Sequence, residues 1–600
     1  MDRFSRDIWW HITQHLDAPE LIALQSVSKA FLQLSRDGYL WRELCFDSSS
    51  AKAAWVRRKE AAEKKSAAKK GLADVANSSD PGSHATPAKA TSSRGRGADS
   101  LLRAMGSWDP RYPEEEVDWY AEYIRRYAPL TASWLRRPVD EHGNVNEEFE
   151  VCGMAVFNPS SSNGASWGNV IVAPISDGGV CLWNLDRPDD AYPGRRMGDI
   201  LARTGPDFLS QDGSAPLGVT SRPFQRKRVT PDGVIDCVSV DSARGKAYFS
   251  VADGLNEVDL ETLQVTRHTR FPSPIIALSE ARMPTPLTVA SEDTLHLHDP
   301  RVQRVAGELA LGDPTDRSRQ SYSLLSEPGP VAIAHVPSSD LGGLPDQQGD
   351  IYVAGRFPSI LDYDRRFWPR LRRAIYSGGQ LSSLTIMPFL SSFDEPGVRW
   401  TKHRGGHTLV ACGDYNGRGS LELHGLRNTS LLPAADRSDH VSFVNRQTAA
   451  SSKLLSVVTQ GTSIVTSDAT GTLKWFERDA RGVLRTFDIN TDAEVHSDPP
   501  AHPIFGRSSG DVALKLLPVD LGRGQGLEQD GMMFWTGERL GMLSFNTTPL
   551  FRGEDLDEKL HSAQEAAELH EKHSYELMMR RALQQQADEV RFMQGLGLGV

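Results

Sequence analysis

A strand pattern that recurs through the middle of the chain restricts its fold more than any other feature. Between residues 150 and 546, short runs of Val, Ile and Leu alternate with polar residues and are separated by Gly and Asp turns, which predicts a sandwich, a barrel or a propeller. In each copy one strand ends in a small residue, often with Asp, and the next ends in an aromatic or acidic residue. The copies are residues 168–186, 245–263, 286–301, 350–366, 407–426, 462–479 and 532–546.

A separate apolar strand precedes most copies, as at residues 234–240, 275–278, 381–387 and 454–459. Seven copies of four strands each predict a mainly β fold, a seven-bladed β-propeller over residues 150–547. Counts of six blades or of eight short ones also fit the pattern. Because the copies are unevenly spaced, we expect residues 188–231 and 299–326 to form long surface loops.

Two of the copies resemble the WD-repeat family. Residues 181–184 (CLWN) and 474–477 (KWFE) approach the Trp-Asp pair that ends such repeats, whereas the Gly-His opening is lacking. The middle of the chain therefore resembles a degenerate, WD-repeat-like propeller, and this resemblance implies that it holds a target protein.

The first 47 residues have a helical period instead. Ile8, Ile12 and Leu16 are four residues apart, as on one face of a short helix. Asp, Pro and Glu then begin a second helix that contains Leu21, and a Val-Ser pair begins a third. So short a segment cannot bury enough surface to be stable alone, and we expect some of its apolar area to contact a partner.

This spacing resembles the F-box family, which reads approximately L-P-x-E-I, I-x-x-x-L, D-x-x-D/E-L, V-S-K/R-x-F/W and L-W-R-x-L. The matching residues are Phe4, Asp7, Ile8, Ile12, Leu16, Asp17, Leu21, Val27, Ser28, Lys29, Phe31, Leu40, Trp41, Arg42 and Leu44. Phe4 stands where Leu is usual, and Ser5 stands where Pro is usual.

The F-box resemblance implies an all-helical domain that binds a Skp-family adaptor and, through it, a cullin. Its fold and its adaptor-binding surface would be carried by Phe4, Ile8, Ile12, Leu16, Leu21, Leu24, Val27, Ser28 and Trp41. The alternative is a generic helical cap on the next domain.

Residues 48–107 are rich in Ala, Lys, Ser, Gly and Arg, with twelve basic residues against five acidic ones. This composition predicts a disordered basic linker, with a frayed helix over residues 51–70. A solvated linker is favoured over a nuclear-import signal or a nucleic-acid tether, because no aromatic residue is placed to stack on bases. Nucleic acid is therefore not expected as a partner.

Two further helices are predicted. Residues 108–149 form a helical linker, in which a helix begins with the acidic turn at 113–116, carries Trp119 and Tyr120 on its apolar face and stops at Pro129. A similar Trp/Tyr-rich helix follows the F-box in related proteins, so the basic tract resembles an insertion between two halves of one module. Residues 553–594 predict a long C-terminal helix that packs on the propeller, projects from it or self-associates.

The sequence shows no constellation for catalysis, a cofactor or a metal. The five cysteines are scattered without a C-x-x-C, and the 17 histidines do not cluster with carboxylates. His296, His298 and Asp299 are the nearest approach to a metal-binding trio, and such alternating polar residues are ordinary on a strand. With no apolar run of 18 residues and a polar N-terminus, we expect no membrane span and a cytoplasmic or nuclear location.

One surface segment combines arginines with aromatic residues. Arg365, Arg366, Arg370, Arg372 and Arg373 surround Phe367, Trp368 and Pro369. This composition is typical of binding hot spots, and arginine suits a phosphorylated or acidic segment of a target. The alternative is that the arginines pair with acidic residues of neighbouring blades while Trp368 packs inward.

An F-box followed by a propeller resembles the receptor subunit of a Skp/cullin/F-box ubiquitin ligase, whose target is an unknown protein. The resemblance implies positioning of the target without chemistry by this chain. The alternative is a scaffold that binds the adaptor and causes no degradation.

Overall fold

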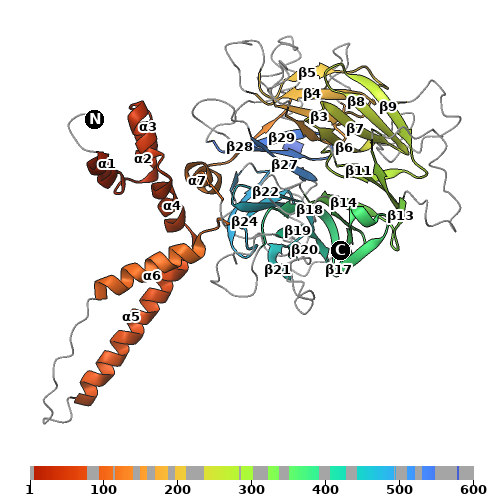
Figure 1. The fold of residues 1–600 in the computed structure, drawn as a ribbon. Coiled ribbons are helices and arrows are strands. Elements are labelled where there is room, and N and C mark those ends of the chain that lie inside the picture. Colours follow the sequence, from red (N-terminus) through yellow and green to blue (C-terminus); the bar gives the residue numbers. More distant parts are fainter. Residues whose placement is uncertain are drawn as a thin grey trace.

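The computed structural model describes residues 6–77, 93–112, 115–138, 149–158, 169–186, 196–210, 235–282, 285–299, 301, 322–336, 350–390, 406–427, 442–491, 493–494, 510–520, 530–546 and 578–579. Phe4 and the predicted helix over residues 553–594 lie outside this part of the chain, except for Met578 and Met579, which are helical and exposed. The described strands form seven antiparallel sheets, and the N-terminal helices lie to one side of them (Figure 1).

The sheets are the blades of a propeller, and their strands follow one another along the chain. Blade 1 contains β2 (Ala155–Phe157), β3 (Val170–Pro174), β4 (Val180–Asn184) and β5 (Ile200–Arg203). Blade 2 contains β6 (Ile235–Asp241), β7 (Lys246–Val251), β8 (Gly254–Asp259) and β9 (Gln264–Arg270). Blade 3 contains β10 (Ile275–Leu278), β11 (Leu287–Ser291), β12 (Thr294–His298) and β13 (Tyr322–Leu324). Blade 4 contains β14 (Pro330–His335), β15 (Ile351–Gly355), β16 (Ser359–Tyr363) and β17 (Leu371–Tyr376).

The last three blades have the same order. Blade 5 contains β18 (Gln380–Met387), β19 (Gly406–Tyr415), β20 (Arg418–Arg427) and β21 (Ser442–Ala450). Blade 6 contains β22 (Leu454–Gln460), β23 (Ser463–Asp468), β24 (Thr472–Glu477), β25 (Val483–Asp488) and β26 (Ala493–Glu494). Blade 7 contains β27 (Lys515–Asp520), β28 (Asp530–Trp535) and β29 (Leu540–Ser544), with β1 (Thr131–Trp134) at its edge.

This arrangement confirms seven blades, and each predicted copy supplies the second and third strands of one blade. The first strands of neighbouring blades contact one another in an unbroken circle, from β2 through β27 and back to β2, so they line the centre of the ring. The prediction of surface loops over residues 188–231 and 299–326 is wrong where β5 and β13 occur. Both strands are short, and β5 is only half-buried, so neither has a strong alternating pattern.

The ring is closed by a strand from the N-terminal side of the propeller. β1 pairs antiparallel with β29, with Thr131 opposite Ser544 and Trp134 opposite Gly541. The propeller therefore begins at Thr131 and not at residue 150, and part of the predicted helical linker belongs to blade 7. Pairing the two ends of the domain covers the edge that β29 would otherwise leave open.

The strands that the sequence identified best are those buried on both faces. β3, β4, β11, β15 and β29 are buried along their whole length. Trp183 and Trp475, from the two endings that approach Trp-Asp, are also buried. The indole nitrogen of Trp183 donates to the carbonyl oxygen of Arg136 at 2.8 Å, which ties blade 1 to the segment after β1.

In the described part of the N-terminal segment, six helices precede the joint with the propeller: α1 (Arg6–Thr13), α2 (Ala18–Gln25), α3 (Lys29–Ser35), α4 (Gly38–Asp47), α5 (Ser50–Asn77) and α6 (Ser93–Trp108). The helix predicted over residues 51–70 is confirmed as part of α5, whereas the predicted disorder is wrong over the rest of α5 and over α6. The two helices project together from the rest of the molecule (Figure 1). Trp55 of α5 donates to the hydroxyl of Ser100 in α6 at 3.0 Å. Alanine, lysine, arginine and glutamate all favour helices, so a polar composition did not imply an irregular chain here.

The next helix along the chain, α7 (Trp119–Tyr127), joins the helical domain to β1. Asp118 caps it, because its carboxylate accepts hydrogen bonds from the backbone nitrogens of Tyr120 at 2.9 Å and Ala121 at 3.2 Å. The predicted start at the acidic turn 113–116 is therefore wrong, while the stop before Pro129 is confirmed.

The register of β18 on β19 can be tested at Gly413, which lies opposite Leu381 beside a bulge. A Cβ atom there would collide with the carbonyl oxygen of Gln380 and lie 2.7 Å from the Cα of Leu381. We expect Gly413→Ala to destabilise the fold by about 1–3 kcal/mol or more, measured by thermal unfolding. Gly205→Ala, where no atom lies within 4 Å of the added carbon, is the control. Equal melting temperatures for both variants would contradict this register.

Candidate functional site: the helical domain and its joint with the propeller

The helical domain has a core that spans a long separation in sequence. Trp41 of α4 and Leu21 of α2 are buried against Trp119 and Tyr120 of α7. The ring of Trp41 lies edge-on to that of Tyr120, with 4.9 Å between the centroids. The prediction that residues 48–107 interrupt one module is therefore confirmed, because α7 completes the core that α2 and α4 begin.

Several apolar side chains of this domain remain exposed. Ile8 is 45% exposed, Ile12 43%, Ile22 46% and Val27 63%. Ile8 and Ile12 lie one turn apart on α1, so they share a face of that helix. A domain this small with so many exposed branched residues has the surface of a binding module.

The structure thus divides the predicted adaptor-binding residues into two groups. Leu21 and Trp41 are buried, and Leu16 and Leu24 are partly buried against the same core. Ser28 caps α3, since its hydroxyl accepts from the backbone nitrogen of Phe31 at 3.3 Å. These side chains maintain the fold, whereas Ile8, Ile12 and Val27 are accessible to a partner.

Ile22 and Tyr39 are also exposed, although the sequence pattern did not point to them. Ile22 directly follows the buried Leu21, and neighbouring residues on a helix point in different directions. That alternation of inward and outward positions was the available signal.

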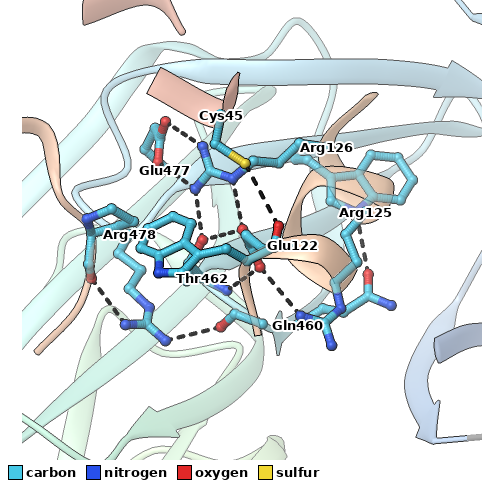
Figure 2. A network of polar contacts seen from close by, with 12 residues as sticks. Cys45, Glu122, Arg125, Arg126, Gln460, Thr462, Glu477 and Arg478 are labelled. Atoms are coloured by element: carbon cyan, nitrogen blue, oxygen red, sulfur yellow. Dashed lines mark hydrogen bonds and ion pairs between the residues drawn. The ribbon is translucent and has the colours of Figure 1, made fainter. Parts of the chain in front are cut away.

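A buried ion-pair network joins α7 to blade 6 (Figure 2). Arg126 donates from Nε to Glu122 Oε1 at 2.6 Å and from Nη1 to Glu477 Oε1 at 2.9 Å. Its Nη2 donates to the hydroxyl of Thr462 at 2.6 Å, and that hydroxyl in turn donates to Glu122. The backbone nitrogen of Thr462 also donates to Glu122, at 3.1 Å. The helix is thus bonded to the turn between β22 and β23 and to the end of β24, all in blade 6.

Two more arginines of blade 6 hold the segment on either side of the network. Arg478 donates from both terminal nitrogens to the carboxylate of Glu115, at 2.6 Å each. Arg485 donates to the backbone carbonyl oxygens of Arg125 at 3.1 Å and Ala128 at 2.7 Å. A cation at the C-terminal end of a helix also interacts favourably with the helix dipole. The segment is therefore fixed both before and at the end of α7.

Burial and charge act in opposite directions on the network. Burial alone would raise the pKa of the Glu122 carboxyl, but Arg126, Arg125 and the hydrogen bond from Thr462 hold that pKa below its ordinary value. Burial disfavours the charge of Arg126, yet the carboxylates of Glu477 and Glu122 raise its pKa above the ordinary value. Both groups are therefore charged at neutral pH, and each stabilises the charged form of the other.

Comparison with known proteins bears on the helical part of the chain. Residues 6–47 match the F-box-like family. They form an F-box-like domain. F-box domains typically bind adaptors of the Skp family, and this one precedes a seven-bladed propeller. None of the curated proteins searched matches the chain.

The arginine segment of blade 4 is not part of the joint, since blade 5 separates it from blade 6. Arg372 Nη2 lies 2.6 Å from both Asp350 and Asp362, and Arg373 Nε lies 2.6 Å from Asp362. Arg366, in the short 3-10 helix η3 (Arg365–Phe367), pairs with Asp364 at 2.8 Å. Among the described residues, the ion pairs of these three arginines lie within their own blade, whereas the alternative interpretation invoked neighbouring blades.

Three other residues of the arginine segment, Arg365, Trp368 and Arg370, take no part in these ion pairs. Arg370 is exposed, and Trp368 is half-buried with its ring 5.5 Å from that of Tyr363. Arg365 lies at the start of η3 and is half-buried. Target binding by this segment stays a prediction.

The histidines considered for a metal have ordinary structural contacts. His296 is buried between aromatic rings and interacts with the Thr294 hydroxyl at 3.2 Å, while Asp299 pairs with Arg301 at 2.6 Å. Within the described ranges, no group of three or more His, Cys, Asp or Glu is arranged to hold a metal ion. None of the helices described is both long and apolar enough to cross a membrane.

The joint predicts a large effect of one substitution. Arg126→Met should lower the free energy of unfolding by about 3–5 kcal/mol, because it removes the nearer of the two cations that pair with the buried Glu122 and also the partner of Glu477. Denaturant unfolding measures this. Lys52→Ala, which breaks the more exposed pair with Asp47, should change the same quantity by less than about 1 kcal/mol. Equal effects of the two variants would show that the network does not hold the fold.

The network also predicts a pH dependence. Because the pKa of Glu122 is lower in the folded protein than its ordinary value of 4.5, the unfolded chain takes up the proton first as pH falls. The stabilisation is complete above that ordinary value and is lost as pH falls through the folded-state pKa. Glu122→Gln should therefore lose less stability than the wild type between pH 5 and pH 3, by circular dichroism. The same loss in both proteins would contradict the assignment.

Proposed function

We propose that the chain is the substrate-recognition subunit of a Skp/cullin/F-box ubiquitin ligase, acting in the cytoplasm, the nucleus or both. One observation carries the proposal. An F-box-like domain leaves Ile8, Ile12, Ile22 and Val27 exposed, while its core is shared with a helix bonded into the propeller.

The role that this arrangement supports is positioning. The F-box-like domain binds a Skp-family adaptor and through it the cullin, and the propeller binds a target protein. Other subunits of the ligase then bring the charged conjugating enzyme to the lysines of the target. Holding target and enzyme in one assembly raises their effective concentration, so this chain needs no catalytic residue. The buried joint keeps the propeller at a constant orientation to the adaptor.

The rim of blade 4 is the proposed target-binding surface, with Arg365, Arg366, Arg370, Arg372 and Arg373 as its basic residues. Phe367 is 66% exposed and Tyr376 is 77% exposed. Exposed aromatic residues beside arginines have the composition of interface hot spots. Arg372 and Arg373 remain about one-third exposed although they are paired, so they can still contact a ligand.

Adaptor binding is tested with Ile12→Asp. If Ile12 lies in the adaptor interface, an unpaired carboxylate there should cost at least about 2 kcal/mol, which is roughly a thirtyfold rise in Kd. The melting temperature should change little, because Ile12 is already exposed. Val444→Asp, at an equally exposed apolar position of β21, should bind the adaptor like the wild type. Retained adaptor binding by Ile12→Asp would contradict the proposal.

The same variant separates a receptor from a scaffold in cells. For a receptor, Ile12→Asp should retain the propeller's target while the ubiquitylation of that target falls and its abundance rises. For a scaffold, ubiquitylation and abundance of the bound protein should be the same with either form of the chain.

A further inference from the structure

Unlike Arg366, Arg372 and Arg373, Arg365 has no acidic partner within hydrogen-bonding distance among the described residues. Its Nε and Nη2 atoms are buried and make no hydrogen bond with any described residue. These two nitrogens lie on one edge of the guanidinium group, the edge that grips two oxygens of a carboxylate or phosphate side by side. A buried donor without an acceptor is costly, and an ordered water or a bound ligand can relieve that cost.

Around Arg365, arginines outnumber carboxylates. Asp350, Asp362 and Asp364 are all buried, and each is within 2.8 Å of a guanidinium nitrogen of Arg366, Arg372 or Arg373. Arg365 is the fourth arginine beside three carboxylates that are already engaged. The cluster therefore has one positive charge more than it needs for its own pairs.

A second unpartnered donor lies at the same end of blade 4. His335 ends β14 and is opposite Ile351, which is opposite Tyr363 at the end of β16, two residues before Arg365. The Nε2 atom of His335 is 2.8 Å from the hydroxyl of Thr288 in blade 3, whereas Nδ1 is buried with no hydrogen-bond partner. When the Thr288 hydroxyl donates to Nε2, the proton of the neutral ring is on Nδ1, which can then donate to a ligand.

The electrostatics agree with this proximity. Burial and the positive charge of Arg365 lower the pKa of His335 to about 3, so the ring is neutral at physiological pH. Burial likewise lowers the pKa of Arg365, against the opposing effect of Asp350. An anion placed between the two side chains would neutralise the unpaired charge.

We propose that Arg365 and His335 form a binding site for one oxyanion group at the interface of blades 3 and 4. The ligand class is a phosphate or a carboxylate, held by the Nε–Nη2 edge of Arg365 and by Nδ1 of His335. The turn that carries Arg365 is at the surface, since Arg366 and Phe367 are exposed, so the site lies beneath the rim and not in the core. This identification of the ligand rests on the proposed receptor function: the natural ligand is a phosphorylated or acidic residue of the target.

The test is titration of the full-length protein with three small probes: inorganic phosphate, N-acetyl-phosphoserine amide and N-acetyl-glutamate amide. Binding is followed by calorimetry at constant ionic strength, with N-acetyl-serine amide as the blank. We expect saturable binding of at least one probe, with Kd raised at least about tenfold by Arg365→Met. Binding of phosphate alone would identify a free-ion site, and binding of an amino-acid amide would identify a residue of a protein as the ligand.

Stability without a ligand gives a second readout. Arg365→Met removes an unpaired buried charge, so its melting temperature in anion-free buffer should equal or exceed that of the wild type. Arg356→Met, at an exposed position between β15 and β16 of the same blade, should bind the probes as the wild type does. A lower melting temperature for Arg365→Met, no saturable binding, or binding unchanged by this substitution would each overturn the site. Adaptor binding by Arg365→Met is measured alongside, so failure of the anion site is distinguished from failure of the receptor function.

Discussion

The ion-pair network of Glu122, Arg126 and Glu477 determines how the two halves of the molecule meet. Burying these charges is costly, and their attraction offsets the cost only when every group has its partner in place. The hydroxyl and amide of Thr462 complete that set. A purely apolar contact would allow α7 to shift along blade 6. Hydrogen bonds and ion pairs are directional, so this set is satisfied in one orientation. Because α7 is also part of the core of the F-box-like domain, the network fixes the orientation of that domain relative to the propeller.

The order of elements along the chain strengthens this coupling. β1 follows α7 after three residues, and β1 closes the ring by pairing with β29. The segment that completes the helical domain therefore leads directly into the strand that completes the propeller. α7 contacts blade 6 and leads directly into β1. Loss of the ion-pair network would therefore loosen the pairing of β1 with β29, and loss of that pairing would loosen the network. Such a connection suits a protein whose function depends on the distance between two binding surfaces.

The sequence predicted the strands that are repeated or fully buried. It did not predict the strands and ion pairs that depend on residues far away in the chain. The seven middle strand pairs were identified because strands such as β3 and β15 are apolar throughout. β1, β5 and β13 were missed because they are short and stabilised by neighbours rather than by their own pattern. Arg126 and its partner Glu477 lie in separate domains, and no local spacing relates them. The arginines of blade 4 were recognised as a group, but the sequence did not show which of them are paired, because the pairing of Arg373 with Asp362 follows from the register of β16 on β17.

A fixed joint is most directly tested by the distance between the two halves in solution. Spin labels at Ala23 on α2 and Val483 on β25 would report on the helical domain and the propeller, at positions that are both exposed. Double electron–electron resonance then gives the distribution of their separation. We expect a single narrow distribution, because buried ion pairs allow one orientation. A broad or two-peaked distribution would contradict a rigid connection between the F-box-like domain and the propeller.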